Sequence, residues 1–357
     1  MIEIINNTKK KIIINFLFIL IIKILFISQN NYKLDDEFLN SKNITSYIEC
    51  LHCGGGNLGN ALIILNNLIN ICENIKCKYI LLPSGLEKVI KNPIYYKEKN
   101  IAILPYSYKY KINICLELNG FEILTFRYKN KLHKNRMYIL KNEIIRNLPR
   151  YNASPDDLYI NIRSGDIFKK VMHAHYAQPP LCFYQKIIND NKLNYKNIYL
   201  ISNGNENPIV DELQKLYPKI KYIHGSALED ASVLVNVYNL VLPVSSFPYS
   251  LIRLNDNLNK IYIYDIMTER EKIFWYGTDY YFKFDNFILY KMEPSLTYKL
   301  KMKGKWNNTK EQINLMIKEK CINNSFYLIS KRKIKNFYYI KKINKNQLIL
   351  PTSLIHF

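Results

Sequence analysis

Apolar residues along the chain follow two spacings, and these two spacings alternate. A short apolar stretch at 47–51 predicts a strand, and a glycine-rich segment follows it. From Leu58 to Cys72 apolar residues recur every three or four positions, which is typical of a helix with one buried face. Another apolar stretch at 79–82 predicts a second strand. This strand–loop–helix–strand order is the unit from which parallel sheets are built.

The alternation starts again after 149–157, where turn-forming residues are concentrated and where we place a domain boundary. In this second half, helical segments separate the apolar stretches that predict strands, at 158–162, 198–202, 220–225, 240–244 and 260–266. In the first half, 101–105 and 121–126 also have strand-like patterns, and 142–148 has a helical one. The two halves together predict an α/β fold with two Rossmann-like domains that face a cleft.

The N-terminal region predicts a membrane anchor. Three lysines precede an apolar run from Ile12 to Ile27, which Asn15 and Lys23 interrupt. The run is short for a span of about 20 residues, although Lys23 can snorkel toward an interface. No small-residue cleavage site follows, which favours an uncleaved signal anchor over a cleaved signal peptide or a buried helix. The positive-inside rule then places the N-terminus in the cytoplasm and the remaining chain in a lumen.

The expected organisation has six parts. They are a cytoplasmic tail (1–11), a signal-anchor helix (12–28), a stem (29–46), a first Rossmann-like domain (47–150), a second Rossmann-like domain (151–287) and an unassigned basic extension (288–357).

The formal net charge of +22 comes mainly from lysines that are spread along the 357 residues. A basic surface attracts anions such as nucleic acid, lipid head groups or phosphorylated small molecules. No nucleic-acid-binding motif accompanies this charge. We therefore interpret it as a solvated lysine-rich surface and expect no nucleic-acid partner.

Seven cysteines leave at least one outside any intrachain disulfide. Cys50 and Cys53 form a C-x-x-C pair, but no second pair with metal-ligand spacing accompanies it, so we expect no zinc site. Four N-glycosylation sequons, which are usable only in a lumen, begin at Asn43, Asn152, Asn307 and Asn323.

Polar residues follow three expected strands of the second domain, at the edge where open parallel sheets bind ligands. They are Arg163, Ser202 with Asn203, and Ser245 with Ser246. The fork-shaped, permanently charged guanidinium of Arg163 matches a phosphate. The two consecutive serines, with the amides that begin the next helix, suit an anion. These positions predict a diphosphate site.

Simpler interpretations exist for each segment. Gly165 allows a sharp turn, and Asp166 can either orient Arg163 in a surface ion pair or bind a ligand hydroxyl. Ser245 and Ser246 can simply cap a helix. The glycine-rich loop at 54–57 lacks the spacing of a Walker A or dinucleotide site. His173 and His175 are spaced like metal ligands, but they have no third partner and suit a solvent or substrate contact.

Three motifs in order resemble the α-1,2-fucosyltransferase family, within the wider arginine-motif fucosyltransferases. "LGN" at 58–60 is similar to that family's glycine-asparagine loop, and "INIRSGD" at 160–166 is similar to its H-x-R-x-x-D motif. The segment 228–254, "LEDASVLVNVYNLVLPVSSFPYSLIRL", resembles its late segment, in which an Asp-led helix precedes N-S-x-F-S. The chain departs from these patterns at Asn161, Ala61, Pro248 and Tyr249.

The resemblance implies an inverting, metal-independent glycosyltransferase of the GT-B class that transfers fucose from GDP-fucose to a glycan hydroxyl and needs no cofactor. The first domain would bind the acceptor, the second the nucleotide sugar, and the enzyme would be a single-pass type II protein of the Golgi or ER membrane. Residues 35–36 and 156–157 are adjacent aspartates, and the chain has no D-x-D motif of the kind that holds a metal against a diphosphate.

Each site residue receives an expected role. Arg163 and Asp166 are expected at the catalytic centre, and Asp166, His175 and Glu229 are candidates for the general base. The expected donor-binding residues are Arg163, Ser202, Asn203, Ser245, Ser246, Phe247, Gly59 and Asn60. The expected acceptor-side residues are His175, Tyr176 and Gln178. A membrane-anchored, non-catalytic glycan- or polyanion-binding protein with the same fold is the alternative, and a nucleic-acid-binding protein is a more distant one.

Overall fold

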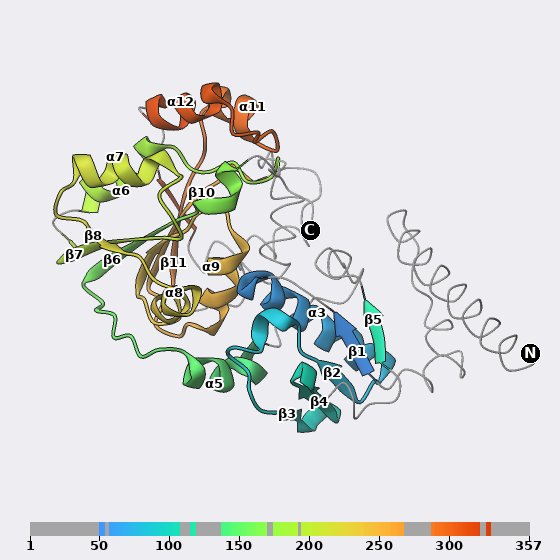
Figure 1. Ribbon diagram of the computed structural model, residues 1–357. Helices are drawn as coiled ribbons and strands as arrows, with labels where there is room; N and C mark the ends of the chain where they lie inside the picture. The colour runs from blue at the N-terminus through green and yellow to red at the C-terminus, as the bar shows by residue number, and fades with distance from the viewer. Residues whose placement is uncertain are drawn as a thin grey trace, which may run out of the picture.

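The structure is a computed structural model that describes residues 50–53, 57–107, 115–118, 137–169, 174–191, 194–267, 287–321 and 326–329. The expected anchor and stem, most of the glycine-rich loop and the expected strand at 121–126 lie outside these residues. Two sheets and the helices around them make up the described chain (Figure 1). None of the described helices is long and apolar enough to cross a membrane.

The first sheet has five strands in the order β3-β4-β2-β1-β5. Its strands pair in parallel, except that β3 runs antiparallel to β4. The strands are β1 (Cys50–Cys53), β2 (Tyr79–Leu81), β3 (Ile94–Tyr96), β4 (Ile101–Leu104) and β5 (Cys115–Leu118). Helix α3 (Leu58–Ile75) connects β1 to β2, as the apolar spacing predicts, and α5 (Met137–Asn147) follows the sheet.

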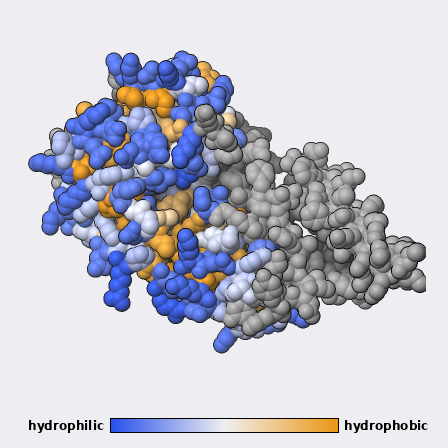
Figure 2. Space-filling view, in the orientation of Figure 1, coloured by the Kyte–Doolittle hydropathy of each residue, from blue (hydrophilic) through white to orange (hydrophobic). Residues whose placement is uncertain are grey.

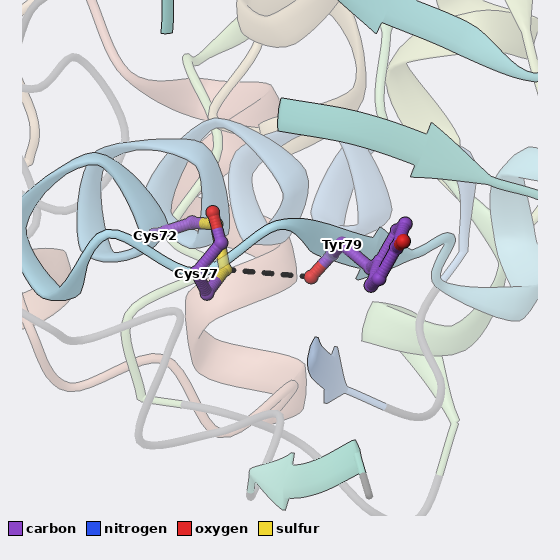
Figure 3. Close-up of a disulfide and its surroundings, with 3 residues drawn as sticks. All are labelled: Cys72, Cys77 and Tyr79. Carbon is purple, nitrogen blue, oxygen red and sulfur yellow. Dashed lines mark hydrogen bonds between the residues drawn. A yellow bond between two sulfur atoms is a disulfide. The ribbon is translucent and has the colours of Figure 1, made fainter. Parts of the chain in front are cut away.

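Helix α3 is almost entirely buried along its apolar face, where Leu62, Leu65 and Ile69 are at most 1% exposed. Lys76 follows the helix as its C-cap, and its left-handed φ of 58° turns the chain back toward the sheet. A disulfide between Cys72 and Cys77 joins the last turn of α3 to the segment that enters β2 (Figure 3). The Cys77 sulfur lies 3.4 Å from the Tyr79 carbonyl oxygen at the start of that strand.

The second sheet has seven strands in the order β12-β11-β10-β9-β6-β7-β8, all parallel except β12. They are β6 (Asp157–Ile162), β7 (Asn197–Ser202), β8 (Lys221–Ile223), β9 (Asn239–Val241), β10 (Lys260–Tyr264), β11 (Ile288–Met292) and β12 (Phe326–Ile329). Every residue of β6 is buried, as expected for a central parallel strand with helices on both faces. The chain runs outward from β6 to β8 and returns with β9 on the other side of β6. The strand order therefore reverses between β6 and β9.

Helices cover both faces of this sheet. On one face α12 (Lys310–Lys318) packs on α6 (Leu181–Asn191) and α7 (Pro208–Leu216), and on the other α8 (Ala227–Leu234) packs on α9 (Ser246–Leu251) (Figure 1). Helix α11 (Leu296–Met302) precedes α12 and packs against it. Hydrophilic residues cover most of the visible surface of the described part (Figure 2).

The sequence predicts most of these elements, but it predicts neither β3 nor β5, and α5 begins at Met137 rather than at 142. The helical segment expected between the predicted strands at 220–225 and 240–244 ends at Leu234, and the chain turns before β9 begins at Asn239. The strand series does not close at 266: β11 and β12 extend the second sheet, so residues 288–292 and 326–329 of the unassigned extension belong to it. The two α/β units meet where α3 packs on α9, and buried residues of both units form one continuous core.

Candidate functional site

The loop after β6 carries the arginine, and its backbone requires a glycine. Gly165 has a φ of +71°, in the left-handed region that side chains disfavour. A Cβ atom on this residue would also lie 2.9 Å from the Asn203 side-chain nitrogen. The sharp turn expected at Gly165 is therefore confirmed, and a short 3₁₀ helix, η4 (Gly165–Phe168), starts at this residue.

Arg163 and Asp166 form an ion pair through Arg163 Nη2 and Asp166 Oδ1. The arginine side chain is 18% exposed and the aspartate 64% exposed, so the pair lies at the surface with the guanidinium partly covered. Arg163 Nε is buried and has no hydrogen-bond partner among the described residues. The structure therefore contains the surface ion pair that was one of the interpretations of the sequence. The other N–H donors of the guanidinium remain for a ligand.

The loop after β7 holds this turn in place through a set of hydrogen bonds. The Ser164 amide donates to Asn203 Oδ1 at 2.9 Å, and the Ser164 hydroxyl and the Gly165 amide donate to Glu206 Oε2 at 3.0 and 3.1 Å. The Asn207 amide donates to the Ser164 hydroxyl oxygen at 2.9 Å. A hydrogen bond from its own backbone, followed by that from Ser164, lowers the pKa of Glu206 below its usual value.

Sequence reasoning missed Ser164, Glu206 and Asn207. The signal was present in "NGNENP" at 203–208, which marks a turn after a strand. A turn signal alone does not say that the turn binds a loop about forty residues earlier in the chain.

Two of the three serines expected to bind the donor, Ser202 and Ser245, use their hydroxyl groups in hydrogen bonds inside the protein. Ser202 is fully buried, and its hydroxyl donates to the Gly204 carbonyl at 2.8 Å. Ser245 is 3% exposed and caps α9, where its hydroxyl oxygen accepts from the Phe247 amide at 3.4 Å. The helix-cap interpretation therefore describes Ser245, while Ser246 and Phe247 are half-buried at the start of the helix.

The segment "LGN" meets α9 directly. A Cβ on Gly59 would lie 2.5 Å from Phe247 Cα and 2.7 Å from its amide nitrogen. The Ser250 hydroxyl lies 2.9 Å from the Gly59 carbonyl oxygen. Asn60 follows in α3, and its buried Oδ1 has no partner among the described residues. The structure thus brings Gly59 and Asn60 to the same place as Ser246 and Phe247.

The three expected acceptor-side residues have different environments. His175 is exposed, Tyr176 is half-buried and Gln178 is fully buried. Gln178 Nε2 donates to the Tyr176 carbonyl at 3.0 Å and to the Val244 carbonyl at 3.1 Å. Gln178 therefore ties the β6–α6 loop to the β9–α9 loop and does not present its side chain at the surface. His173 lies outside the described residues.

Glu229, one of the candidate bases, has a structural role. It is the third residue of α8, and its carboxylate accepts from the Ser226 amide at 2.7 Å to complete a capping box. That backbone hydrogen bond lowers the pKa of Glu229. Because this interaction holds the carboxylate at the helix start, Asp166 and His175 remain as candidates for the base.

A hollow of ≈ 530 Å³ lies at the carboxyl ends of β7 and β8, and it is lined by Gly204, Asn205, Glu206, Tyr222 and His224. The rings of Tyr222 and His224 are nearly parallel, at 19° with centroids 6.0 Å apart, and the Tyr222 hydroxyl donates to Asn205 Oδ1 at 2.9 Å. The sequence predicts only a strand here, because the hollow depends on how three separate loops pack.

Asp230 of α8 interacts electrostatically with both rings of this hollow. It is 4% exposed, and its Oδ1 has no hydrogen-bond partner among the described residues. Burial raises the pKa of Asp230 to about 7, although nearby His224 opposes the shift. A buried carboxylate with an unused acceptor is costly unless something donates to it, which makes Asp230 a candidate ligand contact. Over the described ranges, no three His, Cys, Asp or Glu side chains form a group that could hold a metal ion.

No protein-family model matches the chain, and no curated protein sequence matches it. Among solved structures it is similar to E. coli heptosyltransferase WaaC with ADP, with 10% identity and a TM-score of 0.37 over 60% of this chain and 86% of that one. It is also similar to E. coli ADP-heptose LPS heptosyltransferase II, with 9% identity and a TM-score of 0.37 over 61% and 84% of the two chains. A third similarity is to POFUT1 in complex with GDP, with 9% identity and a TM-score of 0.32 over 59% and 95%. Because these TM-scores are low, the similarities do not define the fold. The two sheets of the chain itself define its architecture.

Proposed function

We propose that the chain is an inverting glycosyltransferase of the GT-B class that uses a guanosine diphosphate sugar, with GDP-fucose the donor that its motifs favour. One observation carries this proposal. At a single edge of the second sheet, Arg163 follows β6, and a hollow lies beside the ends of β7 and β8. Two residues that line this hollow, Tyr222 and His224, interact electrostatically with Asp230, whose buried Oδ1 has no hydrogen-bond partner among the described residues. Because neighbouring strands lie about 4.8 Å apart, β6 and β8 are separated by about 10 Å, which suits a nucleoside diphosphate lying along the edge.

The hollow suits a purine base. Tyr222 and His224 offer ring surfaces, and Oδ1 of nearby Asp230 is an acceptor that no described residue donates to. Guanine presents two neighbouring N–H donors on one edge, whereas adenine presents a donor beside an acceptor. A single carboxylate therefore supports guanine over adenine.

The diphosphate would lie near Arg163, whose permanent charge stabilises the leaving group. In the transfer, the acceptor oxygen bonds to the sugar's anomeric carbon while the bond from that carbon to the diphosphate oxygen breaks. The acceptor proton passes to a base, for which Asp166 and His175 remain candidates. In this proposal the guanidinium supplies the positive charge, so no metal or other cofactor is required.

The first α/β unit would contribute the acceptor side, because α3 brings Gly59 and Asn60 against the start of α9.

We further propose that the chain lies in the lumen of the Golgi or ER as a type II membrane protein. The Cys72–Cys77 and Cys182–Cys321 disulfides support this location, since such bonds persist in oxidising compartments.

Thermal-shift titrations of the purified protein with GDP, ADP, UDP and CMP test the donor. Selective stabilisation by GDP is expected, with loss in Arg163→Ala and retention in Arg146→Ala, a matched change at an exposed arginine of α5. Release of GDP from GDP-fucose in the presence of glycan acceptors then tests transfer. A preference for UDP would reject the guanine assignment, and no shift with any nucleotide would favour the non-catalytic binding protein.

A further inference from the structure

The hairpin formed by α11, α12 and the turn between them contacts the β6–α6 loop that carries Arg163 and Asp166. Its contacts with the first part of the loop come from two side chains of the hairpin turn. Trp306 Nε1 donates to the Ile167 carbonyl at 2.9 Å, and Asn308 Nδ2 donates to the Phe168 carbonyl at 2.7 Å.

The later part of the loop is held by the same hairpin. The Trp306 amide donates to the Ala174 carbonyl at 3.0 Å, and the hydroxyl of Tyr298 donates to the Gln178 carbonyl at 2.7 Å. All four hydrogen bonds therefore run from the hairpin to backbone carbonyls of the loop. Trp306 is 2% exposed and Tyr298 is fully buried, so water does not compete strongly for these carbonyls.

The hydrogen bonds from Trp306 and Asn308 fall at the end of the short 3₁₀ helix η4. Ile167 and Phe168 are the last residues of η4, and the final carbonyls of a helix have no partner within the helix. A four-residue 3₁₀ helix has little stability of its own. Trp306 and Asn308 supply the missing donors, and the Trp306 ring also packs edge-on against Phe168 with centroids 5.4 Å apart.

The hairpin turn is itself well defined. Gln312 completes a capping box with Thr309, and its Nε2 donates to the Lys305 carbonyl at 2.7 Å. Asn308 adopts a left-handed φ of 50°, a conformation that asparagine and glycine tolerate. Beyond α12, the Cys182–Cys321 disulfide joins the end of the hairpin to the first turn of α6, four residues after Gln178.

We propose that this hairpin is a clasp for the donor site, with Trp306 and Asn308 as positioning residues that act through η4. The proposal rests on the proposed function in that the group positioned is the Arg163–Asp166 pair. Without the clasp, η4 loses its terminal partners, Asp166 shifts relative to Arg163, and the guanidinium is no longer preorganised for a diphosphate.

The test compares two variants with a control in the full chain. Trp306→Phe keeps the ring against Phe168 and removes the indole donor. Asn308→Gly keeps the left-handed backbone and removes the amide donor. Lys301→Ala is the control, because Lys301 pairs only with Glu311 of the same hairpin, at 2.6 Å, in the described contacts.

Hydrogen exchange at the amides of 165–169, without ligand, is the first measurement. It is expected to accelerate about tenfold or more in Trp306→Phe and Asn308→Gly and to remain unchanged in Lys301→Ala. The second measurement is GDP-sugar turnover, where kcat/KM for the donor is expected to fall about 10- to 100-fold with KM for the acceptor unchanged.

Each outcome decides a separate question. Unchanged exchange in both variants would overturn the clasp, whatever the activity. Faster exchange with unchanged donor kinetics would overturn the positioning role and leave a purely structural contact. If the native protein neither binds nor turns over a GDP-sugar, the proposed function fails, while the exchange result still decides whether the hairpin holds the loop.

Discussion

Gly59 of α3 lies against the backbone of Phe247 in α9 so closely that a Cβ atom would sit 2.5 Å from Phe247 Cα. This contact joins the two α/β units at the start of the helix that follows β9. The position therefore requires a residue without a side chain, although glycine is a poor helix former.

In Gly59→Ala, helix propensity and packing change the free energy of unfolding in opposite directions. In an unconstrained helix the change would stabilise the protein by up to about 1 kcal/mol. Here it forces α3 and α9 apart, and we expect it to lower the free energy of unfolding by about 1–3 kcal/mol. Urea denaturation measures the difference, with Asn60→Ala as the control for changes at the same helix end. A more stable Gly59→Ala variant would contradict the close approach.

Arg163→Lys tests whether the site needs the two-pronged geometry of the guanidinium or only its positive charge. Lysine keeps the positive charge but cannot make two parallel hydrogen bonds to a diphosphate or keep the same geometry with Asp166. We expect kcat/KM for the donor to fall about 10²- to 10³-fold, with a melting temperature close to that of the native protein. Arg146→Lys, at an exposed arginine paired with Glu143, should leave the rate unchanged. Equal rates in Arg163→Lys and the native enzyme would place the arginine outside the donor site.

Most strands of the sheets could be predicted because they follow from local spacing, whereas β3, β5, β11 and β12 were not predicted. The alternation around β6 and β7 places their ends at Ile162 and Ser202, as the structure has them. The turn at Gly165 could also be predicted, since a glycine in the loop that follows a strand marks a turn. The contact between Gly59 and Phe247 could not be predicted from spacing, because it depends on how two separate units pack.

The state of the polar residues was harder to predict. Residue type does not show that the hydroxyl groups of Ser202 and Ser245 form hydrogen bonds with the backbone, or that Gln178 is buried. The hollow beside Tyr222 and the contacts of Trp306 join segments far apart in the chain. A single sequence carries a signal for each segment but none for their contact.

Removing the two disulfides should have unequal effects. Cys182 and Cys321 close a loop with a sequence separation of 139, whereas Cys72 and Cys77 are separated by 5. In the chain-entropy model, loss of the long loop costs about 5 kcal/mol and loss of the short loop about 2 kcal/mol. Paired Cys→Ser variants and denaturant unfolding measure both. A larger loss for the short loop would show that native-state contacts dominate over unfolded-chain entropy.

Asp230 should make stability depend on pH. Its pKa is raised from 3.8 to about 7 in the folded protein, so between these values the folded state holds a proton that the unfolded state has lost. The protonated Asp230 therefore makes its full contribution to the free energy of unfolding below pH ~4. This contribution falls by about 2–4 kcal/mol as the pH rises to ~7. Asp230→Asn does not titrate there, so the stability difference between the native protein and this variant should change with pH over that range. Parallel pH profiles would contradict the raised pKa.

The same carboxylate should set the base preference. If guanine donates two N–H groups to Asp230, binding favours the ionised form, and GDP affinity should rise as pH increases through ~7. Asp230→Asn replaces one acceptor oxygen with a donor that opposes a guanine N–H. We expect it to weaken GDP binding about 10- to 100-fold while ADP binding changes little. Calorimetric titration at pH 6 and pH 8 measures both nucleotides, and Asp211→Asn on α7 controls for the lost charge. Equal weakening of GDP and ADP would mean that Asp230 supports the fold of the hollow without reading the base.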